Sequence, residues 1–327
     1  MPDNRYIRQQ LVSQLGSESE AKLTNARVLI VGSGGLGSPV STLLAGAGVG
    51  EITLIDDDTV SLSNLHRQTL FTESDIGEFK VHAAKKRLSS INSEITINVI
   101  AERLDLDNAT ELVSSSTVVV DAADNFLASY LLSDLCFAKR IPLVSASVLT
   151  THGYLGVYCG TQNKPAPSLR AVFPAPSSDV NNCNTAGVTG PSVGIIGSYQ
   201  AQEVLKVITQ SESQLLGKLM SLDLWDYRQH IIDFNQSPEP TLSAPLISLG
   251  SVHNSDYLLD VRSPQECSED PVELASGNIP LAELQSRHHE LPNNTRIVCV
   301  CKSGQRALSA AQLLINHGHS EIYVTAR

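Results

Sequence analysis

The sequence predicts an α/β fold with two domains, a larger one built on a mostly parallel sheet and a smaller α/β unit. Short apolar strands alternate with helical patterns along the chain, which is typical of parallel sheets covered on both faces. A glycine-rich turn, Gly32–Gly37, directly follows the first apolar strand. A proline-rich segment, 235–245, separates the two patterned regions and is predicted to be a linker.

The predicted elements follow this alternation. Residues 1–26 are polar and helical in pattern. In the first domain, 1–234, we expect strands at 27–31, 51–55, 94–100, 117–121 and 142–147, with helices at 36–48, 77–91 and 125–139. It continues with a strand at 152–159 that we expect to be antiparallel, a long loop at 164–184, a helix at 191–209 and two strands within 219–234. In the second domain, 246–327, we expect strands at 257–261, 296–300 and 321–324, and helices at 281–289 and 305–317.

The composition excludes several classes of protein. The formal net charge of −11 argues against a nucleic-acid partner, whose surface would need clustered basic residues. No apolar run is long enough to cross a bilayer, and no charged-then-apolar leader begins the chain, so we expect a cytoplasmic protein without a membrane partner. The 6 cysteines form no Cys-x-x-Cys pair, so neither a zinc knuckle nor a dithiol motif is visible.

The glycine-rich turn indicates a nucleotide site. It lies between a strand and a helix N-terminus, where backbone amides bind phosphate. Its spacing fits NAD-binding folds as well as others, and a turn that serves only helix–strand packing is the simplest alternative. Asp56, at the end of the second strand, can accept hydrogen bonds from a ribose, a group that NAD and ATP share.

Polar residues at successive strand ends favour ATP over NAD. Asn64 and Arg67 follow the second strand, Lys80 begins the next helix, and Asp124 and Asn125 follow the fourth strand. Arginine and lysine would stabilise charge on a transferring phosphate, and Asp124 would bind Mg²⁺. Each residue taken singly is equally well a solvated surface charge. Together, at one edge of a sheet, they are typical of a triphosphate site.

These residues belong to a set of motifs that resembles a known family. The motifs are Arg5-Tyr-x-Arg-Gln9, Gly32-x-Gly-Gly-Leu-Gly37, Asp56-x-Asp-x-Val-x-x-Ser-Asn-Leu-x-Arg-Gln68, Gly77-x-x-Lys80 and Asp121-x-x-Asp-Asn125. Over residues 1–234 the chain resembles the MoeB/ThiF (HesA/MoeB/ThiF) family, the bacterial relatives of ubiquitin-activating enzymes. The resemblance implies a Rossmann-like domain that uses ATP and Mg²⁺ to adenylate the C-terminal glycine of a ubiquitin-like sulfur carrier of the MoaD or ThiS type.

The resemblance also implies roles for individual residues. The nucleotide would be bound by Gly34, Gly35 and Asp56, the phosphates by Asn64, Arg67 and Lys80, and Mg²⁺ by Asp124 beside Asn125. Arg8 is expected to reach the ATP of a partner subunit, which implies a homodimer. Molybdopterin synthesis, thiamine synthesis and tRNA thiolation all use such carriers, and the pathway stays open.

The chain departs from the family at its zinc site. Many members bind a structural zinc ion with two Cys-x-x-Cys pairs. The first pair would fall at Ser168 and Ala171 and the second near 238–241, and the sequence has cysteine at neither place. We therefore predict that no structural zinc is bound there.

Two cysteines are candidates for sulfur chemistry. Cys183 precedes the helix predicted near Pro191, and in the resembling family a cysteine at this point is often the sulfur-transferring or acyl-accepting residue; a thiol that only packs the loop is equally well supported. Cys301 follows an apolar strand and opens a tight loop that ends at Arg306. Backbone amides of such a loop, and the helix after it, would stabilise a thiolate or a persulfide anion.

With Asp260–Glu266 upstream of Cys301, residues 246–327 resemble a rhodanese (sulfurtransferase) domain. The resemblance implies that Cys301 carries a persulfide, supplied by a cysteine desulfurase or by thiosulfate, and that Asp260 and Arg262 are structural. The region around 277–280 is abbreviated and the chain stops soon after Val324, so we expect reduced rhodanese activity. The remaining thiols are expected to be structural or incidental: Cys136, Cys159, Cys267 and Cys299.

Two other functions remain open at this point. An NAD-dependent oxidoreductase would use the same glycine turn, and a non-catalytic scaffold would bind the carrier and keep an inert rhodanese-like module. The sequence also leaves open whether Cys183 or Cys301 is indispensable.

Overall fold

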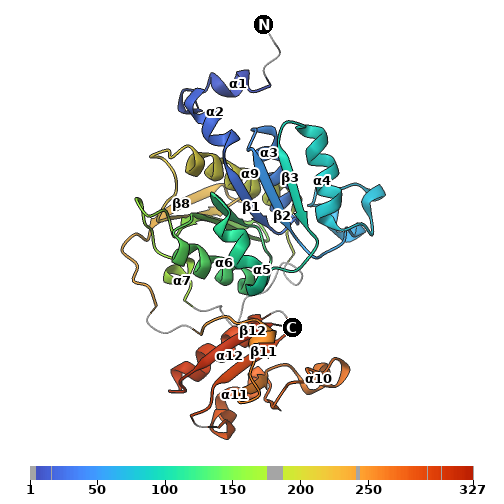
Figure 1. Cartoon of the computed structure of the whole chain (residues 1–327), viewed down its shortest axis with the longest axis vertical. Coiled ribbons are helices and arrows are strands. Elements are labelled where there is room, and N and C mark those ends of the chain that lie inside the picture. The colour runs from blue at the N-terminus through green and yellow to red at the C-terminus, as the bar shows by residue number, and fades with distance from the viewer. Residues whose placement is uncertain are drawn as a thin grey trace.

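The structure is a computed structural model that describes residues 5–15, 17–174, 187–240, 244–292, 294–302 and 304–326. Within these residues it has two sheets, at two ends of the elongated view in Figure 1. The larger sheet has eight strands in the order β3-β2-β1-β4-β5-β6-β7-β8, and the smaller has four in the order β10-β9-β11-β12. None of the helices in the described residues is long and apolar enough to span a membrane.

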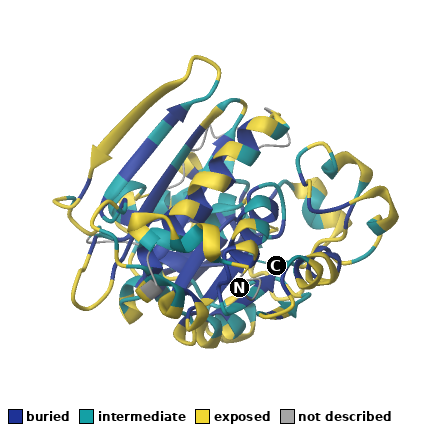
Figure 2. Cartoon of the chain, turned by 90° about the horizontal axis from the view of Figure 1, so that it is seen from above, coloured by how far each residue is buried: buried dark blue, intermediate teal, exposed yellow. Residues whose placement is uncertain are grey.

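The large sheet is parallel on one side and antiparallel on the other. Strands β1 to β5 pair in parallel, and β6, β7 and β8 extend the sheet as antiparallel strands. The bounds are β1 (Arg27–Val31), β2 (Glu51–Ile55), β3 (Thr96–Ile100), β4 (Val118–Asp121), β5 (Leu143–Leu149), β6 (His152–Tyr158), β7 (Lys218–Asp223) and β8 (Arg228–Asp233). Every residue of β8 is exposed, so this strand forms an open edge of the sheet (Figure 2).

Alternate residues of the parallel strands bury two separate apolar cores. Val28 and Ile30 of β1 face the helices α3, α4 and α9, whereas Leu29 and Val31 face α5, α6 and α7. Continuous apolar strands therefore follow from burial on both faces. The helices of this domain are α1 (Ile7–Gln10), α2 (Ser17–Thr24), α3 (Gly37–Gly46), α4 (Lys80–Ile91), α5 (Leu106–Ser114), α6 (Phe126–Lys139), α7 (Leu169–Val172) and α9 (Gly190–Ile208).

Local capping fixes where several of these helices begin. Asp105 accepts hydrogen bonds from the first amides of α5, Asn125 caps α6, and Thr189 caps α9, whose second residue is Pro191. Side-chain oxygens at these positions satisfy amides that have no partner within the helix.

The smaller domain is a parallel sheet covered by three helices. Its elements are β9 (Tyr257–Asp260), α10 (Pro264–Glu269), β10 (Gly277–Asn278), α11 (Leu281–Arg287), β11 (Ile297–Cys301), α12 (Gln305–Asn316) and β12 (Ile322–Ala326). Its main core joins the α5–α6 side of the large domain in one apolar cluster, which includes Tyr130 from α6 and Leu314 from α12.

The prediction of alternating strands and helices is confirmed, with three local corrections. Helix α4 begins at Lys80 rather than at residue 77, because Phe79 bridges to Thr59 before the helix starts. The segment predicted as one loop, 164–184, contains the short helix α7; its residues from 175 onward lie outside the described chain. The sequence analysis did not identify α5, α10 or β10.

Candidate functional site

A cavity of about 1000 Å³ opens at the carboxyl ends of the parallel strands. Strand β1 has β2 on one side and β4 on the other, so the loops that follow them diverge to opposite faces. Ligands of open α/β sheets bind at such a divergence. The lining includes eight of the predicted site residues: Gly34, Gly35, Asp56, Asn64, Arg67, Lys80, Asp124 and Asn125.

A hydrogen bond joins the glycine turn to Asp56. Asp56 accepts a hydrogen bond from the Ser33 amide at 2.7 Å and another from the Asp58 amide at 2.8 Å. Gly32 has φ +93°, and a Cβ there would lie 2.5 Å from the Ala122 carbonyl oxygen, so no other residue fits. Burial raises the pKa of Asp56, while Lys80 and the two amides oppose that rise.

The segment after β2 places two cations in the lining of the cavity, one partly exposed and one buried. The Arg67 guanidinium is partly exposed and contacts the Ser63 carbonyl at 3.1 Å and the His66 ring at 2.8 Å. The Lys80 ammonium is only 6% exposed and pairs with Asp58 at 2.7 Å.

Gln68 provides a further test of whether a ligand fits. Its side chain is buried in the cavity wall, and its carbonyl oxygen has no hydrogen-bond partner among the described residues. A buried polar atom of this kind costs free energy unless a ligand or water satisfies it. The sequence motif contained Gln68, but only the structure shows its unused acceptor.

The end of β4 carries the acidic part of the site. Asp121 is fully buried, accepts a hydrogen bond from Ser145 at 2.7 Å, and has a pKa raised by burial. Gln200 of α9 donates to the Asp121 carbonyl at 2.7 Å and thereby fixes this turn from the other face. Asn125 caps α6 with its side chain, whereas Asp124 is exposed toward the cavity.

The donor set in the cavity fits Mg²⁺. Asp124 has no hydrogen-bond or ion-pair partner in the described chain, and the carboxylates of Asp56, Asp57 and Asp58 lie within 4.8 Å of one another. Mg²⁺ prefers hard oxygen ligands and keeps several waters. The sequence analysis named Asp124 and Asp56 but gave no role to Asp57 and Asp58.

Arg8, another of the predicted site residues, lies away from the cavity of its own chain. Arg8 is exposed on α1, which packs at the amino ends of the strands, where Gln9 donates to the Ala47 carbonyl. A five-residue strand such as β1 spans roughly 16 Å, so Arg8 lies at the opposite edge from the cavity of its own chain. Cys183 falls outside the described residues.

The smaller domain completes the wall of the same cavity. Residues 246–250, Gln305 and residues 324–326 line it. Arg103 donates to the Lys302 carbonyl at 3.3 Å, across the two domains. Gly304 lies so close to α6 that an added Cβ would be 2.5 Å from Leu127. The segment that follows Cys301 is therefore docked on the rim of the nucleotide cavity.

Cys301 lies at the end of a strand and not on the following loop, which corrects the sequence-based placement. It pairs with Ala326 of β12, one of the cavity-lining residues, and is buried. Cys136, Cys159 and Cys299 are buried thiols, and burial raises their pKa values. Cys267 is partly buried, and burial is also the main cause of its raised pKa. These surroundings favour the neutral thiol, as expected of structural cysteines.

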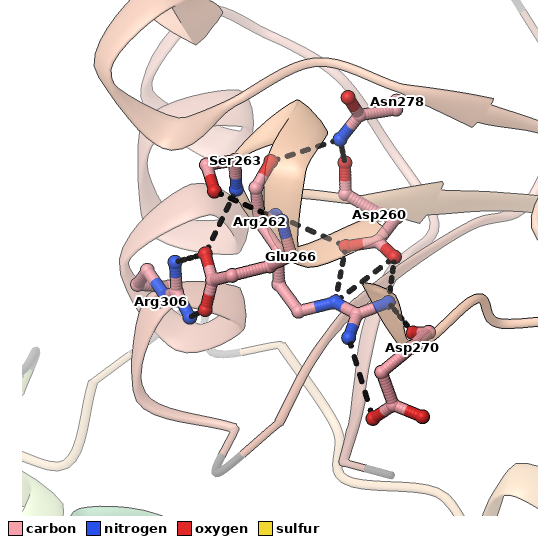
Figure 3. Close-up of polar contacts among 7 residues, drawn as sticks. All are labelled: Asp260, Arg262, Ser263, Glu266, Asp270, Asn278 and Arg306. Atoms are coloured by element: carbon pink, nitrogen blue, oxygen red, sulfur yellow. Dashed lines mark hydrogen bonds and ion pairs between the residues drawn. The ribbon is translucent and has the colours of Figure 1, made fainter. Parts of the chain in front are cut away.

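Two ion pairs support the strand and helix that flank Cys301 (Figure 3). Asp260 and Arg262 are each 2% exposed and pair at 2.7 Å. Burial raises the pKa of Asp260, but hydrogen bonds from Arg262 outweigh burial and lower it overall. Arg306 does not close the Cys301 loop as predicted; it forms two 2.7 Å hydrogen bonds with Glu266 of α10.

The Glu266–Arg306 pair predicts a pH-dependent stability. The Arg306 hydrogen bonds hold the pKa of Glu266 well below its ordinary value of about 4.3. Because the folded pKa is depressed, the stabilisation is complete above the unfolded pKa and is lost as pH falls below about 4.3. The melting temperature of Glu266→Gln should lie below that of the wild type at pH 7, and the gap should shrink toward pH 3. A gap that is constant with pH would contradict the assignment.

A hydrogen-bonded carboxylate lies where the family's zinc pairs would fall. Glu239 accepts a hydrogen bond from the Ser168 amide at 2.7 Å and one from the Ser168 hydroxyl at 2.6 Å. Two residues further, Arg170 pairs with Asp134 at 2.6 Å and lies over the Tyr130 ring. The Glu239–Ser168 hydrogen bonds join the two segments that carry the zinc pairs in the family, and the Arg170 contacts attach the first segment to α6.

The fold and the cavity define a nucleotide-binding α/β domain coupled to a small α/β domain with a cysteine beside the cavity. The chain matches the ThiF family model over residues 6–243 and the rhodanese-like domain model over residues 246–326. It belongs to the ThiF family and carries a rhodanese-like domain after the ThiF region.

Several named proteins are similar to large parts of this chain. The chain is 44% identical over 221 residues to adenylyltransferase and sulfurtransferase MOCS3 of Culex quinquefasciatus, covering 67% of this chain and 50% of that one. It is 34% identical over 267 residues to the SAMP-activating enzyme E1 of Haloferax volcanii, covering 81% of this chain and 95% of that one. A crystal structure of E. coli MccB with ATP superimposes with a TM-score of 0.64 at 27% identity, covering 73% of this chain and 74% of that chain. The matches to the first MOCS3 relatives span about half of their length.

Proposed function

We propose that the chain is an ATP-dependent adenylyltransferase that activates the C-terminal glycine of a ubiquitin-like sulfur carrier and couples this to sulfur transfer, for molybdopterin or thiamine biosynthesis. The observation that carries the proposal is the shared cavity. A triphosphate-type site and the segment after Cys301 face one space of about 1000 Å³.

The first step is nucleotidyl transfer. The glycine carboxylate of the carrier attacks the α-phosphorus of ATP, the bond to the β-phosphate oxygen breaks, and pyrophosphate leaves. Lys80 and Arg67 bind the phosphates and stabilise the charge that builds on them, while Asp56 orients the ribose. When bound at Asp124, Mg²⁺ supplies further charge neutralisation.

The second step uses the resulting acyl-adenylate. AMP is a good leaving group, so the terminal sulfur of a Cys301 persulfide, either directly or after transfer to Cys183, attacks the acyl carbon and displaces AMP, which leaves an acyl disulfide between the carrier and the cysteine. A second thiol, from the other of these two cysteines or from an added thiol reductant, then attacks the cysteine sulfur, forms a new disulfide with it and releases the carrier thiocarboxylate. The persulfide is supplied by a cysteine desulfurase or by thiosulfate. The docking of Lys302 and Gly304 at the rim of the cavity supports the direct route.

Arg8 supports a homodimeric form of the enzyme. Because α1 lies at the amino ends of the strands, Arg8 lies far from the cavity of its own chain, which supports a role for it at the cavity of a second subunit. A dimer in which each α1 approaches the neighbouring cavity would complete both sites.

One experiment tests both steps. The protein is incubated with MoaD-type and ThiS-type carriers, ATP, Mg²⁺ and thiosulfate, and intact carriers are weighed by mass spectrometry. A carrier that gains AMP, and then exchanges it for sulfur, supports the proposal. If no carrier gains AMP, the proposal fails.

The Cys301→Ser variant separates the two steps. We expect carrier adenylation at the wild-type rate and thiocarboxylate formation near background, because serine removes the sulfur and nothing at the phosphate site. Cys267→Ser, at a partly buried thiol of the same domain, is the matched control and should retain both steps. If Cys301→Ser formed thiocarboxylate at the wild-type rate, the assignment of Cys301 would be wrong and another thiol would carry the sulfur.

A further inference from the structure

Two contacts hold the segment that follows Cys301 against the large domain. The Arg103 guanidinium, in the loop between β3 and α5, donates to the Lys302 carbonyl at 3.3 Å. Gly304 is packed so closely on Leu127 of α6 that an added Cβ would lie 2.5 Å from that side chain. The smaller domain lies beneath α5 and α6 in Figure 1, and these two helices pack against each other. The segment is therefore held by the chain at the starts of two neighbouring helices.

The backbone around Arg103 is fixed by the cap of α5. The Asn108 side chain donates to the Arg103 carbonyl at 2.8 Å and accepts a hydrogen bond from the Asp105 amide at 3.0 Å. The Asp105 side chain in turn accepts hydrogen bonds from the first amides of α5. A reciprocal cap of this kind orders the turn that precedes a helix. The Arg103 side chain thus extends from an ordered turn.

Both contacts come from segments that also carry the nucleotide site. The Asp56 amide donates at 3.2 Å to the carbonyl of Ile100, the last residue of β3, and Arg103 lies three residues further on. On the other side, Leu127 lies three residues after Asp124. A shift of the docked segment relative to either contact is therefore a shift relative to the nucleotide site.

The two contacts differ in what they fix. The apolar contact between Leu127 and Gly304 favours close approach but has little directional preference. A hydrogen bond requires the N–H to point at its acceptor, and an ionised donor such as a guanidinium makes it stronger. Domains of one chain move relative to each other unless their interface is large and apolar. The Arg103–Lys302 hydrogen bond therefore fixes the orientation of the Cys301 end of β11 beside the cavity.

We propose that Arg103 is a positioning residue for the sulfur-transfer step, a role that rests on the proposed function. It holds the carbonyl that follows Cys301, so that a persulfide formed on this thiol meets the acyl-adenylate of the adjoining cavity. Reactions between two bound groups depend steeply on their alignment, and a misplacement of about 1 Å can cost about a hundredfold in rate. Loss of the Arg103 side chain should therefore slow sulfur transfer and spare the two reactions that precede it, adenylation and persulfide formation.

Arg103→Met tests this role, because methionine keeps an unbranched side chain and removes every hydrogen-bond donor. Three reactions of the full-length chain are measured separately: ATP–pyrophosphate exchange with a carrier, persulfide formation on Cys301 from thiosulfate with release of sulfite, and thiocarboxylate formation on the carrier with an added thiol reductant. We expect the first two at wild-type rates and the third about ten- to a hundredfold slower. Arg87→Met, at an exposed arginine of α4, is the matched control and should retain all three rates.

The three rates separate this role from the proposed function. Thiocarboxylate formation at the wild-type rate in Arg103→Met would overturn the positioning role. A parallel loss of pyrophosphate exchange or of persulfide formation would also overturn it, because that result indicates general damage to the fold. An equal loss in Arg87→Met would show that the effect is not specific to Arg103. If the wild type itself formed no carrier–AMP, the proposed function would fail and the positioning role with it.

Discussion

Arg67→Ala is expected to reduce carrier adenylation by about 10²- to 10³-fold. The guanidinium lies at the mouth of the nucleotide cavity and has only the Ser63 carbonyl and His66 as described hydrogen-bond partners, so its charge is available to a phosphate. Losing one group that stabilises charge in a transition state typically costs this much in rate. ATP–pyrophosphate exchange in the presence of a carrier measures the loss directly.

Lys86→Ala is the matched control for this prediction. Lys86 lies on α4 with Lys80, but its side chain is exposed and pairs with Glu78. We expect this variant to exchange pyrophosphate at the wild-type rate. Loss of exchange in both variants would indicate general damage to α4 and its surroundings, and not a specific role for Arg67.

The Arg67→Ala variant also separates the competing functions. Carrier binding should survive in Arg67→Ala while adenylation is lost, whereas a non-catalytic scaffold would show no exchange in the wild type either. An NAD-dependent oxidoreductase would bind a nicotinamide nucleotide and would not exchange pyrophosphate. Membership of the ThiF family supports adenylation over the other two functions.

The parts of the site that follow from single strands could be predicted from the sequence. Parallel strands end at the same edge of a sheet, so Asp56, Lys80 and Asp124 are brought to one cavity once the alternation of strands and helices is recognised. The motif spacings carry this information because each residue lies directly after its own strand or at the start of its own helix.

The parts that depend on distant pairs could not be predicted. Arg306 has its guanidinium engaged by Glu266, forty residues earlier in the chain. Helix α7 is only four residues long, and it is held by Ser133, which accepts a hydrogen bond from the Leu169 amide. No local pattern encodes such contacts, since isolated helices of this length are unstable.

The position of Cys301 shows the same limit at a functional residue. The apolar run and the following Lys302 suggested that the strand ended at Val300. Pairing with β12 extends β11 by one residue, so that Cys301 lies opposite Ala326 and is buried. Cys301 itself does not line the cavity, and its pairing partner Ala326 does.

Asp260→Ala is expected to destabilise the rhodanese-like domain by about 3–5 kcal/mol. The substitution leaves the Arg262 guanidinium buried, with the Asp270 carbonyl at 2.9 Å and the Asp270 carboxylate at 4.0 Å as its remaining described partners. An uncompensated buried charge carries a penalty of this size. Hydrogen–deuterium exchange of β9 and β11 amides in the full chain would report the change in the free energy of opening.

Two further variants make this prediction specific. Arg287→Ala removes ion pairs with Glu283 and Glu290 that are solvent-exposed, so it should destabilise the domain far less than Asp260→Ala does. The double variant Asp260→Leu/Arg262→Met removes both buried charges and should recover much of the stability lost in Asp260→Ala, because no unpaired charge remains. If Asp260→Ala were no more destabilising than Arg287→Ala, the buried pair would not hold the strand that precedes the Cys301 site, and the structural role assigned to Asp260 and Arg262 would be wrong.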